Sequence, residues 1–398
     1  MTICEKNKCT GCYACVNACP WGCISMQEDM YGELHPIVNE EECRHCNKCE
    51  KICPNNKPIL TVYPRKCYAA WITDQAKRSI CASGGIATIL SEYVIKKGGV
   101  VYGTAYDEGF IPKVVCAKTI ADLEAFKGSK YVQSIVGGET FKQIETTLYE
   151  GRRVLFIGTP CQVAGLKNYL GKDFDSLMTM DLICHGVCPT RYFQSEVDYI
   201  TKKYHIRNLS DIRFRGNDGK NYCLSFWRDK RRDNSYIKEL VYSKPRYEQP
   251  YFAGFMLGVT LRENCYTCNY ARPERIGDIT LGDFLRLGKK TPFPYEVKQP
   301  SVVLLNNDKG ETFYTEASAH LSTCLVNVER DYSERLEYRP SLLEPFRRHP
   351  LYAEFRRKYP HQGFVKAIRS ALRVFIWKQK YAHIKKSLRN KIKSCLYR

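Results

Sequence analysis

Eight cysteines near the start of the chain repeat one spacing twice, C-x2-C-x2-C-x3-C followed by proline. The first copy is Cys9, Cys12, Cys15 and Cys19, and the second is Cys43, Cys46, Cys49 and Cys53. In this bacterial pattern, three thiolates of one copy and the fourth thiolate of the other hold a [4Fe-4S] cluster. We therefore expect one cluster on Cys9, Cys12, Cys15 and Cys53, and a second on Cys43, Cys46, Cys49 and Cys19. Zinc ligation or disulfides are the alternative, which the repeat and the proline after each copy disfavour.

Such clusters transfer single electrons, whereas the small carriers that supply them usually deliver a hydride, which is two electrons. A flavin connects the two regimes, because it accepts a hydride and releases electrons one at a time. Ser83-Gly84-Gly85, just before an apolar helical pattern, is a candidate seat for its phosphates, since N–H groups at a helix N-terminus bind anions. The same residues also suit a plain N-cap and tight turn without a ligand.

Further cysteines are candidates for a third metal site. Cys265 and Cys268 have metal-ligand spacing and need two more thiolates. Cys161 and Cys184 each follow an expected buried strand, at the edge where α/β sheets bind their ligands, so they are the natural partners. Cys188 is a rival for either place. A structural zinc on the same thiols, or a cysteine pair that only packs, is the alternative.

The elements that would position these residues alternate between strand and helix. Apolar strands are expected near 66–72, 100–104, 154–157 and 177–183, with helices at 86–94, 141–148 and 162–170. This alternation favours a parallel or mixed sheet with helices packed on it. Two short strands are expected on either side of Tyr31-Gly32, and antiparallel strands over 210–303.

The chain is long enough for two or three cores, with 398 residues of which 44% are hydrophobic. We expect an α+β or α/β multidomain protein. A bacterial-type ferredoxin fold over 1–62 precedes a mixed α/β flavin-binding domain over 66–340 and a basic amphipathic helical tail over 341–398. The many thiols and the lack of a leader before Cys4 favour a reducing cytoplasm over a secreted, disulfide-bonded fold.

The formal net charge of +20 is concentrated in the tail. From Ser341 to Arg398 there are sixteen Lys and Arg against two acids, which accounts for +14 of the total. Because the charge is an appendage and not a groove around the chemistry, we expect no nucleic-acid partner. A nucleic-acid arm beside purely structural clusters is the disfavoured alternative.

Taken together, several stretches resemble the coenzyme F420 hydrogenase/dehydrogenase beta subunit family, with a double-cluster ferredoxin domain in front. The resemblance covers about residues 66–290 and is carried by Ser83-Gly-Gly, Gly128-Ser-Lys-Tyr-Val-Gln-Ser134, Gly158-Thr-Pro-Cys-Gln162, Cys184-His-Gly-Val187, Arg262 followed by Cys265 and Cys268, and Asp278-Ile-Thr-Leu-Gly-Asp-Phe284. These stretches are specific in combination.

The resemblance implies an iron–sulfur flavoprotein oxidoreductase that exchanges hydride between FAD and a deazaflavin, coenzyme F420 or similar. It implies a flavin site lined by Ser83, Gly84, Gly85, Lys130, Tyr131, Gln133 and Ser134. It also implies a third [4Fe-4S] cluster on Cys161, Cys184, Cys265 and Cys268. The expected partners are a small hydride carrier and a redox partner protein or complex subunit. His185, beside a ligand candidate, is either a proton donor or a structural histidine.

Two departures concern the substrate. Relatives usually continue the Gly-Asp-Phe segment with Trp-Gly-Ile, where this chain has Leu285-Arg286-Leu287, and they often have proline in place of Cys188. Both leave the flavin and cluster interpretation standing but weaken the case for a deazaflavin. The alternative function is a ferredoxin-like electron-transfer adaptor subunit with no substrate of its own.

The tail admits two interpretations. Phe364, Ile368, Leu372, Phe375 and Trp377 lie among many basic residues, which suits contact with an anionic membrane surface at the inner face. A helix packed on the body with a solvated basic face explains the same pattern.

Overall fold

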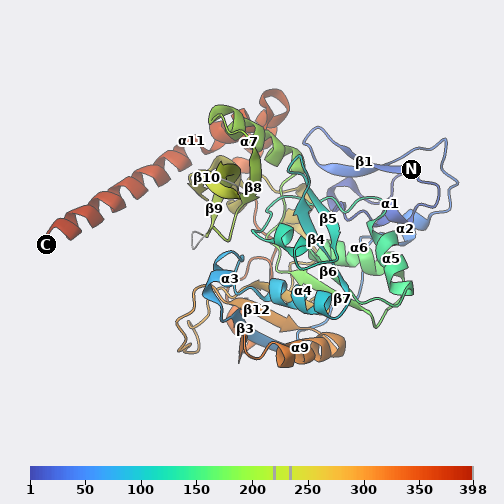
Figure 1. Ribbon diagram of the computed structural model, residues 1–398. Coiled ribbons are helices and arrows are strands. Elements are labelled where there is room, and N and C mark those ends of the chain that lie inside the picture. The colour runs from blue at the N-terminus through green and yellow to red at the C-terminus, as the bar shows by residue number, and fades with distance from the viewer. Residues whose placement is uncertain (218–220, 233–234, 397–398) are drawn as a thin grey trace.

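The structure, a computed structural model, describes residues 1–217, 221–232 and 235–396 (Figure 1). The N-terminal segment lies against one end of a large sheet, a helical and antiparallel lobe lies beside it, and the last helix extends away from both (Figure 1). No helix in these described ranges is long and apolar enough to cross a membrane.

The N-terminal segment folds as two structurally similar halves. Its elements are η1 (Lys6–Lys8), α1 (Ala14–Ala18), β1 (Ile24–Glu28), β2 (Leu34–Val38) and α2 (Lys48–Lys51), with β1 and β2 paired antiparallel. Corresponding residues of the two cysteine repeats share a left-handed backbone: φ is 67° at Gly11 and 49° at His45, and 66° at Tyr13 and 57° at Asn47. The repeat in the sequence therefore corresponds to a repeat in the backbone conformation of the two loops.

The main sheet contains eight strands in the order β13-β3-β12-β11-β7-β6-β4-β5. These strands are β3 (Lys66–Ile72), β4 (Val100–Tyr106), β5 (Pro112–Ala117), β6 (Val154–Gly158), β7 (Leu177–Leu182), β11 (Ile279–Asp283), β12 (Ser301–Leu305) and β13 (Leu325–Glu329). The four central strands β4, β6, β7 and β11 run parallel, and the outer pairs are antiparallel. The mixed α/β fold expected from the sequence is confirmed.

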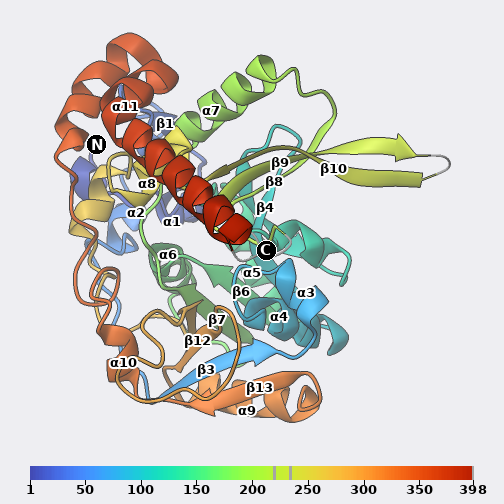
Figure 2. The same cartoon turned by 90° about the vertical axis from the view of Figure 1, so that its left-hand side faces the viewer.

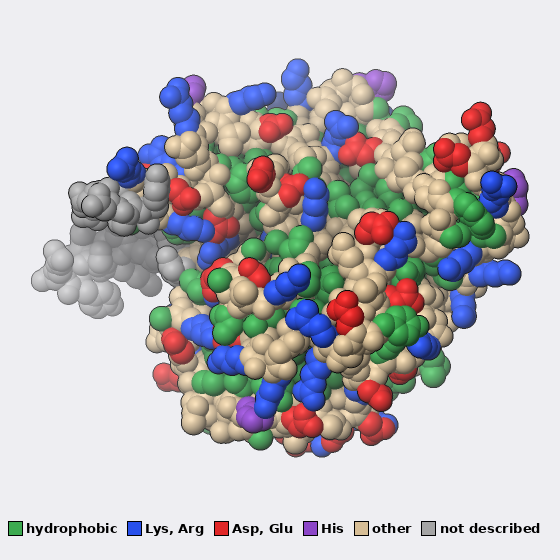
Figure 3. All heavy atoms as spheres, turned by 45° about the vertical axis from the view of Figure 1, so that its right-hand side comes forward, with side chains coloured by type: hydrophobic (Ala, Val, Ile, Leu, Met, Phe, Trp, Pro, Cys, Tyr) green, Lys and Arg blue, Asp and Glu red, His purple; other side chains and the backbone are tan. Residues whose placement is uncertain are grey.

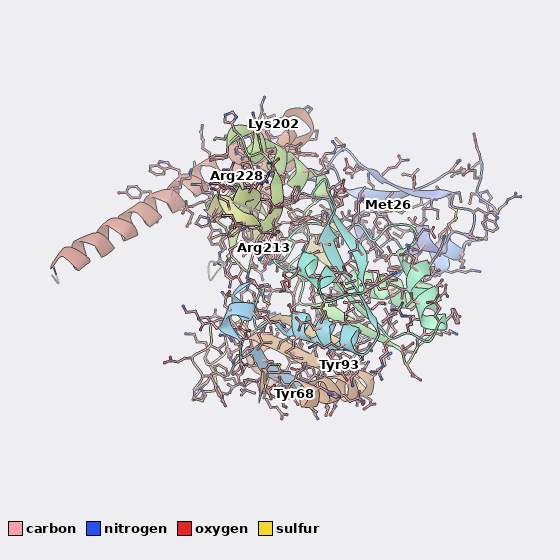
Figure 4. All side chains as sticks on the ribbon, viewed as in Figure 1. Met26, Tyr68, Tyr93, Lys202, Arg213 and Arg228 are labelled. Carbon is pink, nitrogen blue, oxygen red and sulfur yellow. The ribbon has the colours of Figure 1, made fainter. Side chains whose placement is uncertain are left out.

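Helices cover both faces of this sheet because its strands bury alternate residues on opposite sides. Val101 and Leu155 face one core with α4 (Ile86–Lys96) and α9 (Asp308–His320), where Tyr68 of β3 and Tyr93 of α4 also lie (Figure 4). Val100 and Phe156 face the other core with α5 (Thr140–Tyr149) and α6 (Pro160–Leu170). Cys161, in the first turn of α6, and Cys184 follow the carboxyl ends of β6 and β7 in this helix-covered sheet.

Short helices make the remaining connections of this body. They are α3 (Gln75–Ser79), η2 (Asp122–Phe126), η3 (Glu263–Thr267) and α10 (Tyr332–Leu336).

A second lobe has its own aromatic core. It contains α7 (Thr190–Lys203), β8 (Leu209–Arg213), β9 (Cys223–Arg232), β10 (Ser235–Pro245), α8 (Pro250–Met256) and α11 (Leu351–Leu396). Strands β8 to β10 form a separate antiparallel sheet, and β9 and β10 extend from the body as a ribbon (Figure 2). Rings of α7, α8 and α11 fill the core between them. Gly363, with φ 68° and ψ 171°, divides α11 into two helices, as the glycine's conformational freedom permits.

The expectation of antiparallel strands over 210–303 was incomplete, because the segment also contains α8 and η3. The segment contains the antiparallel sheet β8–β10, but its last strand, β11, leaves that lobe and joins the main sheet parallel to β7. Spacing along the chain does not reveal this insertion, because β11 pairs with residues about a hundred positions earlier.

Candidate functional site

The first cysteine set lines one cavity of about 340 Å³ in the N-terminal segment. Its lining includes the four cysteines expected to share a cluster, Cys9, Cys12, Cys15 and Cys53. The structure therefore brings together the first three cysteines of one repeat and the last of the other. Cys4 lines the same cavity and was not expected there.

The second set surrounds a small apolar cluster. Cys19 and Cys49 are buried, Cys43 packs against the same cluster, and Cys46 is exposed. Cys23, which the sequence pattern does not include, lies with its Sγ atom 3.3 Å from that of Cys19. Each half of the segment thus holds one extra thiol beside its predicted ligands.

Cys161, Cys184, Cys265 and Cys268 line one cavity of about 690 Å³, a volume that includes its opening to solvent. Cys161 lies in the first turn of α6, where the N-cap Thr159 and Gln162 form a capping box. Cys184 follows β7, Cys265 lies in η3, and Cys268 ends η3. Three separate parts of the chain therefore deliver four thiols to one place.

Burial makes these four groups unfavourable as isolated thiolates. It raises the pKa of Cys184 to about 12 and that of Cys268 to about 11, and it also raises the pKa of Cys161 and of Cys265. A bound metal centre reverses this preference, because its positive charge deprotonates the thiols that ligate it. Four soft donors in a water-poor cavity fit an iron–sulfur cluster.

The cavity also contains an unpaired donor. The Nε2 atom of Gln133 is buried without a hydrogen-bond partner, although its Oε1 atom accepts from Arg262 at 2.6 Å. A sulfur acceptor in the cavity would satisfy this amide. In the described ranges, no three His, Cys, Asp or Glu side chains gather closely enough to hold one metal ion. The four thiolates of a [4Fe-4S] cluster each bind a different iron, so they lie farther apart than the ligands of a single ion.

Cys188 does not line this cavity. It is fully buried in the aromatic core of the second lobe, with its Sγ atom 3.2 Å from Oγ1 of Thr260. Its position suits a packing role.

The residues expected to line a flavin lie in two groups. Gln133 and Ser134 line the cavity of Cys161, Cys184, Cys265 and Cys268. Gln162 donates from Nε2 to Oγ of Ser134 at 2.9 Å. Ser83, Gly84 and Gly85 lie at the start of α4 and do not line it. Gly85 is the N-cap of α4 with φ 87° and offers no side chain, so the first-turn N–H groups lack a side-chain acceptor.

Arg215 connects these groups. Its guanidinium donates to the carbonyl of Ala82, to the Tyr131 hydroxyl at 3.2 Å and to Asp283 at 2.9 Å. Tyr222 donates to the same carboxylate at 2.7 Å. Two of the stretches that carried the resemblance, and the residue just before a third, therefore contact one buried arginine. Sequence reasoning missed Arg215, because nothing in its spacing marks it as buried.

Two candidate residues have structural partners. Lys130 donates from Nζ to the carbonyls of Ala125 at 2.9 Å and Lys127 at 3.1 Å, and burial lowers its pKa to about 7. His185 lies between the rings of Phe255 and Phe346, and burial lowers its pKa to about 4. His185 also lines the cysteine cavity.

Gly84 has an explanation without a ligand. A Cβ atom there would lie 2.2 Å from the carbonyl oxygen of Ala70, so only glycine fits this approach of two backbones. Arg286 shows the reverse situation. Its φ is 70°, a left-handed conformation that glycine adopts more readily than arginine does.

Fold and cysteine arrangement together define an α/β protein with ferredoxin-type cysteine loops at its N-terminal end. Comparison with protein families agrees: a 4Fe-4S dicluster domain matches residues 8–57, and the N-terminal and C-terminal parts of the coenzyme F420 hydrogenase/dehydrogenase beta subunit match residues 67–137 and 151–330. The chain belongs to the coenzyme F420 hydrogenase/dehydrogenase beta subunit family and carries a 4Fe-4S dicluster domain. The resemblance predicted from the sequence motifs is confirmed.

Two proteins of Methanocaldococcus jannaschii are similar in sequence. One is uncharacterized and is 25% identical over 217 residues, which span 44% of this chain and only 56% of that protein. The other is an uncharacterized ferredoxin, 31% identical over 64 residues, which span 16% of this chain and 82% of that protein. A chain of the solved F420-reducing [NiFe] hydrogenase complex from Methanosarcina barkeri aligns over 79% of this chain and 92% of its own length, with 16% identity and a TM-score of 0.40.

Proposed function

We propose that the protein is an iron–sulfur flavoprotein oxidoreductase that passes electrons between a hydride carrier and [4Fe-4S] clusters. One observation carries this proposal: Cys161, Cys184, Cys265 and Cys268 line a cavity that shares the wall residues Thr10 and Gly11 with the first cysteine cavity. Two adjoining cysteine-lined cavities are the arrangement that short-range electron transfer requires.

In this proposal, some residues of the chain would hold the cofactors and others would keep water away from them. Cys161, Cys184, Cys265 and Cys268 would hold a third cluster, and the loops 83–85 and 130–134 would hold FAD. A bound flavin exchanges hydride and single electrons, and bound clusters carry the single electrons onward. Val187 and Phe346 contribute apolar surface to the cavity wall, which limits the access of water.

The two proposed cofactor sites lie close together. Tyr131 stacks on Phe255 at 4.8 Å between ring centroids, and Phe255 lies 4.7 Å from the ring of His185, which lines the cysteine cavity. Gln133 and Ser134, two and three residues after Tyr131, reach the cavity directly. A flavin beside Tyr131 would therefore be within a few side chains of the third cluster.

Coenzyme F420 or a similar deazaflavin is the hydride carrier that the family suggests, and a redox partner protein or complex subunit is the expected electron partner. Arg286 is exposed where relatives have glycine, so it adds a positive charge and bulk after Asp283.

A second function has specific support. Gly84 is explained by its packing against Ala70, and Lys130 by its bonds to the carbonyls of Ala125 and Lys127. An electron-transfer adaptor that retains the fold but binds no flavin would keep both contacts. This second function is tested by the same experiment.

The test is anaerobic purification of the full chain with iron, sulfide and flavin quantified together. We expect about twelve irons and one FAD per chain, because three clusters hold four irons each. Cys184→Ser should lose about four irons, whereas Cys188→Ala should lose none, since Cys188 lies outside the cavity. A spectral screen with reduced deazaflavin and NADH would then identify the hydride carrier.

The outcomes separate the candidates. Apoprotein that cannot be reconstituted with flavin, yet holds all its iron, would favour the adaptor. About eight irons together with zinc would confine redox chemistry to the N-terminal segment. Loss of iron in Cys188→Ala instead of Cys184→Ser would contradict the ligand assignment.

A further inference from the structure

Arg262 links the third cysteine site to the first cluster loop. Its backbone N–H donates to the carbonyl of Val187 at 2.9 Å, and its own carbonyl accepts from the N–H of Cys265 at 3.0 Å. Its side chain is fully buried, and Nη2 donates to the carbonyls of Cys9 and Leu34, both at 3.1 Å. A single residue therefore contacts one expected ligand of each site.

The guanidinium lies directly behind the wall between the two cavities. Thr10 and Gly11 line both cavities, and a Cβ atom on Gly11 would lie 3.5 Å from Nη1 of Arg262. Gly11 has φ 67°, and the same Cβ atom would lie 2.4 Å from Nε2 of Gln133. Because no side chain fits at Gly11, only backbone atoms separate the guanidinium from the two cavities at this point.

The charge of Arg262 lacks a protein counter-ion. Its acceptors are neutral: the two carbonyls, Oε1 of Gln133 at 2.6 Å and Oδ1 of Asn264 at 3.1 Å. Among the residues that the structure describes, Arg262 forms no ion pair. Glu263, the next residue, pairs with Arg348, and Glu33, which accepts from the N–H of Glu263, pairs with Arg356.

Arg335 is also buried and likewise donates to carbonyls, those of Asp283 and Tyr338, but two other buried arginines have carboxylate partners. Arg215 pairs with Asp283, and Arg275 pairs with Asp181. A buried cation is unfavourable unless an anion lies nearby, and breaking such a pair is strongly destabilising. Clusters held by thiolates are anionic centres, and both cavities beside Arg262 are lined by thiols.

We propose that Arg262 is the shared counter-charge of the two cysteine sites and raises the reduction potential of the cluster in each. Reduction adds one negative charge to a cluster, and a fixed cation in a dry environment stabilises the reduced form more than the oxidised form. Because Arg262 contacts both sites, it shifts both potentials in the same direction. The difference between the two potentials, which drives electron transfer between the clusters, therefore changes little. The third-site half of this inference rests on the proposed function, and the first-site half rests on the dicluster domain.

The test is a redox titration of anaerobically purified full-length protein with dithionite, followed by electron paramagnetic resonance. Arg262→Gln removes the charge, and Arg262→Lys keeps it while losing the forked geometry. We expect Arg262→Gln to lower the equilibrium constant for one-electron reduction of the first and third clusters about tenfold. This change lowers each reduction potential by about 59 mV. The cluster on Cys19, Cys43, Cys46 and Cys49 should move less, and Arg262→Lys should recover most of the shift.

Two further variants make the test decisive. Gln133→Glu places a carboxylate against the guanidinium without removing it, so it should lower the same potentials even if Arg262→Gln does not fold. Arg191→Gln, at an exposed arginine that pairs with Glu28 of the N-terminal segment, is the matched control and should leave the potentials unchanged.

An unchanged first-cluster potential in both Arg262→Gln and Gln133→Glu would overturn the inference. Equal shifts in Arg262→Gln and Arg262→Lys would also overturn it, because geometry and not charge would then be the cause. A wild-type protein without the third cluster would contradict the proposed function, while the first-cluster potential still decides the role of Arg262.

Discussion

Lys130 illustrates how one side chain can serve either a structural or a binding role. Its amine is half-buried, lies 5.1 Å from the ring centroid of Tyr106 and caps the carbonyls that end η2. Burial lowers its pKa to about 7, far below the ordinary value of a lysine. The group is therefore charged below about pH 7 and neutral above it, before any ligand binds.

This shift predicts a pH-dependent affinity for flavin. If Lys130 faces a phosphate of FAD, binding weakens several-fold as pH rises through and above 7, because the ammonium loses its proton. The bound anion itself favours the charged form, so the midpoint in the complex lies above that of the free protein. Titration of flavin-free protein with FAD at several pH values measures the effect.

Lys130→Arg should bind FAD with little pH dependence, since arginine stays charged, and Lys130→Met should bind weakly at every pH. Lys113→Met, at a partly exposed lysine that pairs with Asp107, is the control. The same pH profile in wild type and Lys130→Met would mean that Lys130 only caps η2.

At the residue scale, spacing predicts some ligands and not others. The eight N-terminal cysteines are placed by loops of a few residues, so local sequence suffices. Cys161, Cys184 and the pair Cys265 and Cys268 meet only because the sheet brings three distant segments together, and here the family resemblance was needed. The absence of a counter-ion at Arg262 is a property of the folded interior, which no spacing records.

At the element scale, α6 both presents Cys161 and supports the first cysteine loop. Gly165 lies in the middle of this helix, and a Cβ atom there would lie 3.0 Å from Cβ and 3.1 Å from Sγ of Cys12. Alanine favours a helix over glycine by about 1 kcal/mol, so the helix itself would not be weakened. The contact with Cys12 therefore determines the effect of a substitution.

We predict that Gly165→Ala lowers the iron content of the first cluster slightly and that Gly165→Val lowers it strongly, because the Cys12 loop must move away. Iron and sulfide per chain, with circular dichroism to verify the fold, are the measurements. Gly138→Ala is the matched control, since its Cβ atom would make an ordinary 3.4 Å contact with Val16 of the same segment. Full iron content in Gly165→Val would contradict this account of the helix.

The strands β3, β4, β6 and β7 and the helices α4, α5 and α6 could be predicted, because apolar periodicity and glycine stops mark them, whereas α7, α8, α9, β5 and β13 were not predicted. The order of the sheet could not be predicted. β3, the first strand after the N-terminal segment, pairs with β12 and β13, which come more than two hundred residues later. Pairings of that kind depend on which exposed edges remain after the central strands assemble, and the sequence between them does not encode the choice locally.

At the scale of the whole molecule, the tail has two distinct parts. Phe364, Ile368 and Leu372 are buried in the aromatic core, and Arg369 pairs with the buried Glu196 at 2.7 Å. The first part is therefore packed on the body, and these residues do not face a membrane as one interpretation of the tail expected. Elsewhere, the surface drawn in Figure 3 mixes basic and acidic side chains.

Beyond this part, α11 extends away from the body (Figure 1). Val374, Trp377 and Tyr381 are 59%, 64% and 58% exposed, and their spacing of three and four residues places them on one face of the helix. Lys378 and Lys380 are exposed beside them. An apolar face with aromatic residues and adjacent lysines suits the interface of an anionic bilayer.

We predict that the protein co-sediments with vesicles of phosphatidylcholine and phosphatidylglycerol, less so with phosphatidylcholine alone, and that added salt weakens the binding. Replacing Val374, Trp377 and Tyr381 with serine should abolish co-sedimentation without changing iron content, because none of the three packs in the core. Deleting residues 362–398 would remove Phe364 and Ile368 from the core and is therefore a test of folding instead. The matched control replaces the exposed Tyr149, at the end of α5, with serine. Unchanged sedimentation of the triple variant would contradict membrane binding by this helix face. A protein subunit would then be the expected partner of the exposed face.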